Sequence, residues 1–217
     1  MSIRKYLEHT LLKPEATKEQ IQTLCAEAKE YDLGGVCVNA CHVAEAAAVL
    51  KGTTVKVVTV VGFPLGADLA PVKALAAQLA VEHGADEVDM VLNIGALKDG
   101  DYELVENDIR AVVQAVPGHA VKVIIEACLL TDEEKIKACE LIARAGAAFV
   151  KTSTGFSKGG ATEADVKLLA AEAAKYGLGV KAAGGIRDLK TVQAMVAAGA
   201  DRIGTSGGAA IAREERP

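Results

Sequence analysis

The strongest constraint on the fold is a series of short, almost continuously apolar runs that are rich in Val and Ile. Runs of this kind are typical of strands buried on both faces, as in a parallel sheet that helices cover. They occupy Gly35–Val38, Lys56–Val61, Glu87–Leu92, Val121–Glu126, Phe149–Thr152, Gly179–Ala183 and Arg202–Thr205. Stretches with helical three- and four-residue spacing separate them, including Lys18–Tyr31, Pro71–His83, Tyr102–Val116, Asp132–Ala145, Glu163–Tyr176 and Leu189–Ala198.

A weak internal repeat supports this alternation. The segments 84–88, 146–150 and 199–203 each contain a Gly that ends a helix, a small residue and the start of an apolar run. This is the joint between helix and strand in a repeated β/α unit. The segment 131–134 resembles a capping box, which predicts a helix beginning directly after it.

A short eighth strand near His9–Leu11 would complete a (β/α)8 barrel. Eight units in 217 residues leave about 27 residues per unit, which is short but workable for this fold. We favour the barrel over an open doubly wound sheet, because the units are even and no G-x-G-x-x-G motif follows the first strand. No linker divides the chain, so we expect one TIM-barrel domain over residues 1–217.

The net charge and the cysteine pattern limit which binding partners and which cellular compartment are expected for this chain. The net charge is −5 and no long basic run occurs, so neither nucleic acid nor an anionic membrane is a predicted partner. The five cysteines form no C-x-x-C pair, which favours reduced thiols. No signal-peptide pattern and no apolar stretch of membrane-spanning length occurs, so we expect a cytosolic protein.

In a β/α barrel the active site lies at the carboxyl ends of the strands. The polar residues that end the apolar runs are therefore the candidates for chemistry. They are His9, Thr10, Cys37, Asn39, Asp89, Asn93, Glu126, Lys151–Thr154, Lys181, Thr205 and Ser206.

Two lysines distinguish this set. Lys151 and Lys181 lie on consecutive predicted strands, and a buried lysine needs a reason. One such lysine could simply pair with a carboxylate, but two that face each other repel, and burial also penalises their charge, so one pKa falls. Lowering it from about 10.4 to about 7–8 takes roughly 4 kcal/mol. The neutral amine that results can attack a carbonyl carbon.

Asp89 is an acid inside an apolar run, where it must be paired or functional. Strand alternation places residues 87, 89 and 91 on one face of the predicted strand. A structural ion pair with a lysine and an acid–base role through a water both fit this position.

Glycines end the last two strands and indicate a phosphate site. Gly184 and Gly185 follow one strand, and the segment 204–208, with Gly204, Ser206 and Gly207, follows the other. Barrels often bind phosphate at this place through loop amides and a short helix N-terminus. Ordinary tight turns are the alternative.

Two other chemistries fit poorly. The segment 204–208 matches G-x-S-x-G, but no His follows it, whereas an α/β-hydrolase places its His after the nucleophile. Of the four histidines only His9 lies near a predicted strand end, and no pair has the spacing of metal ligands. We therefore expect a reaction that uses neither a metal nor a cofactor.

Seven segments in one order resemble the deoxyribose-phosphate aldolase family of class I aldolases over nearly the whole chain. They are 9–13 (HTLLK), 35–39 (GVCVN), 58–66 (VTVVGFPLG), 87–91 (EVDMV), 150–156 (VKTSTGF), 181–187 (KAAGGIR) and 204–206 (GTS).

The resemblance implies reversible cleavage of 2-deoxy-D-ribose 5-phosphate to acetaldehyde and D-glyceraldehyde 3-phosphate. By the family pattern Lys151 forms the Schiff base, Lys181 keeps it neutral and joins proton transfer, and Asp89 belongs to the proton relay. Thr10 and Cys37 match pocket positions without a required catalytic role. The phosphate-side positions that match are Thr154, Gly155, Gly184, Gly185, Gly204 and Ser206. Family members are often dimers or tetramers, so we expect a homo-oligomer.

Two departures from the family pattern concern the site. Glu8 stands where the family usually has Asp, which lengthens the side chain by one methylene near Lys181. Gly207 replaces a usual second Ser, which removes a hydroxyl donor to phosphate. We predict that activity is retained and that phosphate affinity is weakened.

Two rival functions remain open from the residues. One is a barrel Schiff-base lyase with a longer keto sugar phosphate as donor, which a donor screen would distinguish. The other is a catalytically silent phosphate-binding barrel that acts as a sensor or scaffold. The paired lysines argue against this second function.

Overall fold

The computed structural model describes residues 2–215, and over this range eight parallel strands close into one barrel. The strands follow one another around the ring in chain order, and β8 pairs with β1. They are β1 (Leu7–Leu11), β2 (Gly35–Val38), β3 (Lys56–Val61), β4 (Glu87–Val91), β5 (Ala120–Ile124), β6 (Phe149–Lys151), β7 (Gly179–Ala183) and β8 (Arg202–Thr205). The predicted (β/α)8 barrel is confirmed, and the eighth strand expected near His9–Leu11 is β1. The ends of the predicted domain, 1–217, lie outside the described residues.

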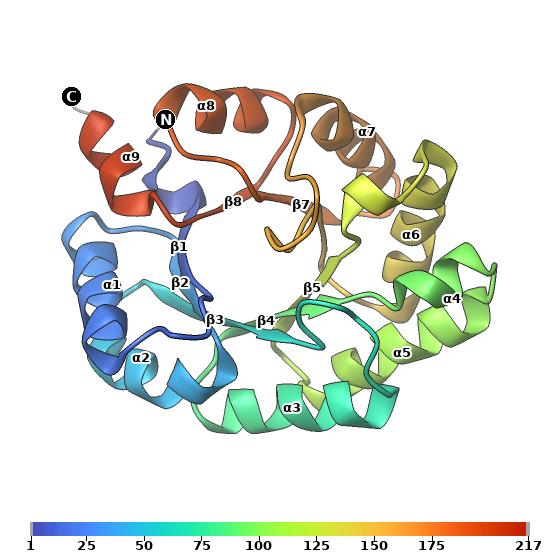
Figure 1. Cartoon of the computed structure of the whole chain (residues 1–217), viewed down its shortest axis with the longest axis horizontal. Coiled ribbons are helices and arrows are strands. Elements are labelled where there is room, and N and C mark those ends of the chain that lie inside the picture. The colour runs from blue at the N-terminus through green and yellow to red at the C-terminus, as the bar shows by residue number, and fades with distance from the viewer. Residues whose placement is uncertain (1, 216–217) are drawn as a thin grey trace.

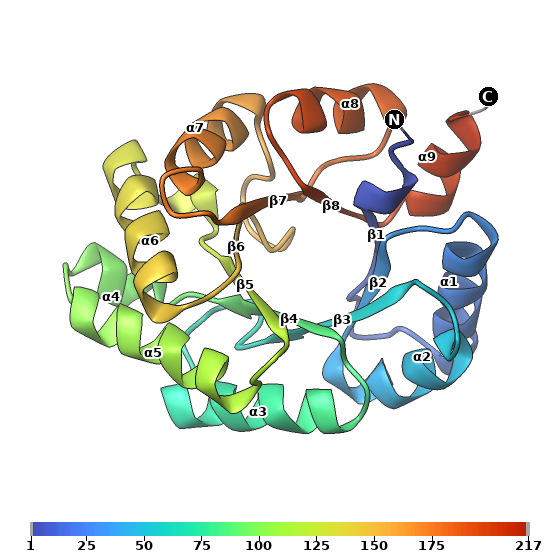
Figure 2. The same cartoon turned by 180° about the vertical axis from the view of Figure 1, so that it is seen from behind.

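Helices form a ring around the outside of the barrel (Figure 1, and from behind in Figure 2). They are α1 (Lys18–Glu30), α2 (Val43–Leu50), α3 (Ala70–Glu82), α4 (Ile94–Lys98), α5 (Tyr102–Ala115), α6 (Asp132–Ala145), α7 (Glu163–Ala173), α8 (Leu189–Ala197) and α9 (Gly208–Glu214). Short 3-10 turns are η1 (Arg4–Tyr6), η2 (Ala40–His42) and η3 (Ala127–Leu129). The predicted helical stretches agree with α1, α3 and α5 to α8 to within three residues at each end. Helices α2, α4 and α9 were not among those predicted.

Capping explains why the helices begin and end where they do. Thr131 and Glu134 form the predicted capping box at the start of α6, in which each side chain accepts a hydrogen bond from the other residue's backbone N–H. Gly146 ends the same helix with φ of 83°, a left-handed conformation that glycine adopts without the steric cost of a side chain. The chain is thus turned back toward the next strand at the position that the repeat predicted.

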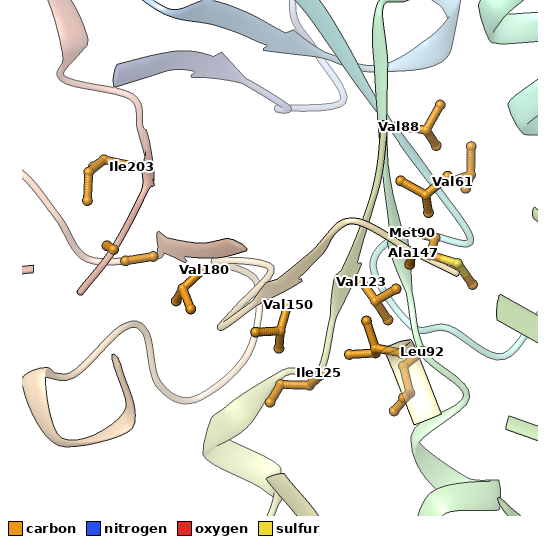
Figure 3. Close-up of a cluster of buried hydrophobic side chains, with 14 of the residues drawn as sticks. Val61, Val88, Met90, Leu92, Val123, Ile125, Ala147, Val150, Val180 and Ile203 are labelled. Atoms are coloured by element: carbon orange, nitrogen blue, oxygen red, sulfur yellow. The ribbon is translucent and has the colours of Figure 1, made fainter. Parts of the chain in front are cut away.

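The main core lies between the strands and the helices. Figure 3 shows buried side chains such as Val88, Met90, Val123, Val150 and Val180 on the outer side of the strands. Burying one such side chain contributes about 1.5–3 kcal/mol, so this shell supplies much of the stability of the fold. Because side chains alternate along a strand, the neighbouring residues point into the barrel.

The interior of the barrel has an apolar side and a side that carries charged groups. Leu12, Cys37, Val58 and Val60 form an apolar cluster on the side of β1 to β3, against which Phe63 packs. The opposite side carries buried charged groups from β1 and from β4 to β7. A buried charge must be paired or hydrogen-bonded, so these groups form a connected network.

No helix within residues 2–215 combines the length and the apolar character needed to cross a membrane.

Candidate active site

A cavity of about 380 Å³ opens at the carboxyl ends of the strands, where the fold places active sites. Its walls come from the ends of β1, β6, β7 and β8 and the loops that follow them. Figure 1 shows the loop between β6 and α7 reaching in toward the barrel centre. The lining residues are Thr10–Lys13, Lys151, Thr154–Phe156, Ala183–Arg187 and Gly204–Ser206.

Lys151 and Lys181 meet at one carboxylate oxygen. Their strands pair with Lys151 directly opposite Lys181, so both side chains enter the barrel at one level. The Nζ atoms of Lys151 and Lys181 donate to Oδ2 of Asp89 at 2.7 and 2.6 Å, respectively. Lys151 is 3 % exposed, and Asp89 and Lys181 are 0 % exposed. The two amines are therefore buried neighbours, and of the three residues only Lys151 lines the cavity.

A third buried lysine, Lys122 on β5, was missed by the sequence reasoning. Its Nζ donates to Oδ1 of Asp89 at 2.9 Å and lies 2.7 Å from Oε2 of Glu87. The signal in the sequence is a lysine inside an otherwise apolar run, and the structure pairs Lys122 with Asp89 on the neighbouring strand. The rule that active-site residues lie at the carboxyl ends of the strands does not identify it, because Lys122 lies near the start of its apolar run.

Glu8 on β1 completes the network on the far side of Lys181. Its Oε2 accepts a hydrogen bond from Nζ of Lys181, and its Oε1 lies 3.6 Å from Nζ of Lys122. The extra methylene of Glu8 relative to an Asp therefore does not prevent contact with Lys181. The side chain is 2 % exposed, so its charge acts on both lysines with little screening by water.

The two facing lysines are driven toward opposite protonation states. Burial is the largest cause that lowers the pKa of Lys151, and repulsion from Lys181 adds to it, while Asp89 opposes both. Burial also disfavours the charge on Lys181, but Asp89 and Glu8 outweigh it and raise the pKa of Lys181. The surroundings thus favour the neutral form of Lys151 and the charged form of Lys181.

The carboxylates of the network are held in their ionised form. Burial alone would raise the pKa of Asp89, but the three lysines lower it well below its usual value, with Lys122 the largest of these. The pKa of Glu8 is lowered in the same way, because Lys122 and Lys181 outweigh burial. Both acids are therefore acceptors at neutral pH, and they favour cations in their surroundings.

The net charge of the buried cluster indicates which reaction intermediate it stabilises. Its members are three lysines and three carboxylates: Lys122, Lys151, Lys181, Glu8, Glu87 and Asp89. With a neutral Lys151 the cluster carries one excess negative charge, and a protonated imine on Lys151 removes that excess. The site is thus electrostatically complementary to an iminium ion, which is the form of preorganisation that accelerates reactions.

Cys37 lies in the apolar half of the barrel and is 1 % exposed. Burial raises the pKa of its thiol to about 11, so the reactive thiolate form is disfavoured at neutral pH. Cys37 is not among the residues that line the cavity, so the structure places it in the apolar interior and not at the expected pocket position.

The phosphate-side positions surround one end of the cavity. Gly184 and Gly185 have φ of 86° and 79°, and a Cβ at Gly184 would lie 3.0 Å from the Cα of Gly160. Only glycine fits that approach without moving the facing backbone. Gly207 does not line the cavity, and its N–H donates to Oγ1 of Thr205 at 3.0 Å.

Several cavity residues were not predicted as site residues, and several candidate strand-end residues, such as His9, Asn39 and Asn93, do not line the cavity. Lys13 and Arg187 add positive charge to the lining, and Phe156 adds an aromatic ring. The ring of Phe156 meets that of Phe63 edge to face, with 5.3 Å between centroids. His9 points out of the barrel, where its Nε2 lies 2.9 Å from Oε2 of Glu27 in α1, because neighbours in a strand point to opposite sides.

We expect Lys122→Met to lower the free energy of unfolding by about 3–5 kcal/mol, because it removes one of the cations that the buried carboxylates share. Urea denaturation monitored by circular dichroism measures the change. Lys18→Met is the matched control, because Lys18 is an exposed lysine whose side chain is 76 % accessible, and surface pairs contribute at most about 1 kcal/mol. Equal stability of the two variants would contradict the role given to Lys122.

Comparison with known proteins agrees with this geometry. A family model described as DeoC/LacD family aldolase matches residues 6–214. Deoxyribose-phosphate aldolase of Streptococcus equi subsp. zooepidemicus is 59% identical over 215 residues, which cover 99% of this chain and 97% of the relative. The Clostridium tetani enzyme of the same name is 56% identical over 217 residues, with 100% of both chains covered.

A solved structure extends the likeness to three dimensions. The tetrameric deoxyribose phosphate aldolase from Aeropyrum pernix superposes with a TM-score of 0.91 at 34% sequence identity, covering 98% of this chain and 90% of that chain. The match of the family model over nearly the full length, the high identity to the relatives and the shared barrel lead to one assignment. The chain belongs to the DeoC/LacD family of aldolases.

Proposed function

We propose that Lys151 is the Schiff-base lysine of a class I aldolase that reversibly cleaves 2-deoxy-D-ribose 5-phosphate to acetaldehyde and D-glyceraldehyde 3-phosphate. The reaction itself follows from the family and from relatives named deoxyribose-phosphate aldolase. The observation that carries the residue assignment is the position of Lys151, whose pKa burial lowers and which lines the cavity beside Lys181 and Asp89. A neutral amine in that place is the nucleophile that the reaction needs.

The first half of the reaction forms the imine. The neutral Nζ of Lys151 attacks the aldehyde carbon C1 of the open-chain sugar phosphate, which gives a carbinolamine. Charged Lys181 supplies a proton as the hydroxyl leaves as water, and a protonated imine remains on Lys151. Asp89, already hydrogen-bonded to both amines, stabilises the new cation and holds Lys181 in position for the transfer.

The second half breaks the C2–C3 bond. The iminium ion draws the electron pair of that bond toward nitrogen, while a water held by the relay takes the proton of the C3 hydroxyl group. Glyceraldehyde 3-phosphate leaves, and the enamine that remains on Lys151 is protonated at C2. Hydrolysis of the resulting imine releases acetaldehyde and restores the amine and Lys181 to their starting protonation states.

We place the phosphate at the end of the cavity formed by the loops after β7 and β8, against which Thr154 and Gly155 of the loop after β6 lie. The glycines there leave the backbone open to close approach, and Arg187 lies in the same wall. Gly204 at the end of β8 and Ser206 directly after the strand line the cavity, whereas Gly207 does not. Backbone amides and charged side chains together are the usual means of holding phosphate in this fold.

A second copy of the chain is the proposed protein partner. Helix α3 and its approach carry exposed apolar side chains along one outer face, namely Leu65, Leu69, Val72, Leu75 and Leu79. A contiguous apolar face of this kind is typical of an interaction site. The Aeropyrum pernix relative is described as tetrameric, and sedimentation velocity would establish whether this chain forms a dimer or a tetramer.

Two other expectations stay predictions: that residues 1–217 form one domain, and that the enzyme acts in the cytoplasm.

The direct test of the function is a coupled assay for glyceraldehyde 3-phosphate. The purified chain is mixed with 2-deoxy-D-ribose 5-phosphate, and the triose phosphate is followed by its conversion with an NADH-linked enzyme. We expect steady product release, with acetaldehyde formed in equal amount. If the deoxy sugar phosphate is not cleaved while a longer keto sugar phosphate is, the assignment of the donor is wrong.

A further inference from the structure

Glu126 stands out among the buried acids within residues 2–215 because its carboxylate pairs with no lysine or arginine, whereas Asp108, for example, pairs with Lys73. It follows β5 and has φ of 43° and ψ of 62°, a left-handed conformation that side-chain-bearing residues rarely adopt. It is 3 % exposed. No salt bridge within residues 2–215 includes it. A strained backbone and a buried acid without a cation, located beside a reactive site, indicate a functional constraint.

The carboxylate of Glu126 is directed mainly at Thr154 in the loop between β6 and α7, and its Oε1 also lies 4.0 Å from Sγ of Cys128. Oε1 accepts a hydrogen bond from the backbone N–H of Thr154 at 3.3 Å, and Oε2 accepts one from its hydroxyl. Oγ1 of Thr154 in turn accepts from the backbone N–H of Phe156 at 3.0 Å. Thr154, Gly155 and Phe156 all line the cavity, so Glu126 is one side chain removed from the space that substrate would occupy.

The same two loops touch at further points. The N–H of Ala127 donates to the carbonyl oxygen of Thr152 at 2.7 Å. Sγ of Cys128 lies 3.6 Å from Oγ of Ser157, and a Cβ at Gly159 would lie 2.8 Å from the Cβ of Cys128. The loop after β5 therefore lies against the loop after Lys151 along most of its length, with Glu126 at the end nearest the cavity.

A carboxylate is the group that this position requires. The hydroxyl of Thr154 already accepts from Phe156, so its own proton must go to another acceptor, and the N–H of Thr154 needs an acceptor as well. An ionised Glu offers two acceptor oxygens and no donor, whereas Gln offers one oxygen and one NH2 group. Glu126→Gln would thus set a donor against one of the two donors of Thr154 while keeping size and shape.

We infer that Glu126 is a positioning residue that fixes the Thr154–Phe156 segment against the phosphate end of the bound sugar. The inference rests on the proposed function. Glu126 does not touch substrate and acts through Thr154. Because the contact is made to the cavity wall and not to Lys151 or Asp89, its loss affects substrate binding more than the chemical step.

The test compares Glu126→Gln with wild type on phosphorylated and unphosphorylated 2-deoxyribose. We expect the KM for the phosphate ester to rise about 10-fold, the effect of losing one hydrogen bond to a charged group. We expect the KM for free deoxyribose and the rate of borohydride trapping with acetaldehyde to stay within about threefold of wild type, because neither involves the phosphate. Glu163→Gln is the matched control, because Glu163 lies in α7 beyond the same loop and its side chain is 56 % accessible.

The outcomes separate the two claims. If wild type itself fails to cleave the deoxy sugar phosphate, the proposed function is wrong. If wild type is active and Glu126→Gln either leaves both KM values unchanged or raises them equally, the inference about Glu126 is overturned.

A second variant covers the case in which Glu126→Gln does not fold. Thr154→Val removes the hydroxyl donor with almost no change of shape, and Thr154→Ser keeps it. We expect the Val variant to show the same selective rise in KM and the Ser variant, which keeps the hydroxyl donor to Glu126, to show a smaller rise. Equal behaviour of the two Thr154 variants would contradict the link between Glu126 and the loop.

Discussion

Lys151→Met is expected to lose at least about 10⁴-fold in kcat for cleavage of the deoxy sugar phosphate, because without the amine no covalent intermediate forms. Methionine has nearly the length and shape of lysine, and Lys151 is buried against the network with 3 % exposure. The change also removes a buried amine whose charge burial disfavours, so the folded state should be retained. The coupled assay for glyceraldehyde 3-phosphate measures the loss.

The control for this variant is Lys167→Met, an exposed lysine on α7 whose side chain is 65 % accessible. It should keep full activity. Thermal melting followed by circular dichroism checks that Lys151→Met is folded. If folded Lys151→Met keeps more than a few per cent of wild-type kcat, the nucleophile is a different group and the assignment fails.

Lys181→Met is expected to reduce kcat about 10²–10⁴-fold and to move the acidic limb of the pH–rate profile to higher pH. Lys181 repels a charge on Lys151 and shares Oδ2 of Asp89 with it. Removing Lys181 ends the repulsion and leaves that oxygen to Lys151 alone. Both changes raise the pKa of Lys151, so a smaller fraction of the amine is neutral at any given pH below that pKa.

The direction in which the acidic limb of the pH–rate profile moves tests the role of Lys181. The pH dependence of kcat/KM reports the free enzyme, so it should be measured for wild type and Lys181→Met in one set of buffers. Partial recovery of activity at alkaline pH is the expected result. An unchanged or more acidic limb would show that Lys181 does not set the protonation state of Lys151. Lys190→Met, a lysine in α8 away from the network, serves as control.

The sequence was sufficient for the barrel and for the main pair of lysines. The apolar runs predicted β2 to β8, and the polar residues along those runs included Lys151, Lys181 and Asp89, whereas β1 was inferred as the strand that completes the barrel. This worked because parallel strands bring their carboxyl ends together, so residues far apart in sequence become neighbours once the fold is known. Strand alternation placed residue 89 on the same face as residue 87, and both contact Lys122.

The physical cause of the shifted pKa was only partly anticipated. Repulsion between the two lysines does lower the pKa of Lys151, but burial contributes more and Asp89 acts in the opposite direction. Burial and side-chain distances are tertiary quantities, and no pattern in the chain gives their relative size. Lys122 was not predicted for a related reason, because its pairing with Asp89 depends on the register of β4 against β5.

The sequence also did not predict the directions of side chains or the loop contacts around the cavity. The outward direction of His9 depends on the pleat of β1, and its neighbour Glu8 takes the inward place beside Lys181. Gly207 belongs to the glycine-rich segment that predicted a phosphate site, yet its amide is used within the turn. The contact of Glu126 with Thr154 joins two loops, and loop conformation depends on packing more than on periodic patterns.

The most direct measurement of the central claim is chemical trapping of the intermediate. Wild-type protein is incubated with acetaldehyde or with 2-deoxy-D-ribose 5-phosphate, reduced with sodium borohydride, digested and mapped by mass spectrometry. Only the amine that is neutral and faces the cavity can form the imine, so the reduced adduct is predicted on Lys151 and on no other lysine of the buried cluster. An adduct on Lys181 or Lys122, or none on Lys151 in protein that turns over substrate, would contradict the account.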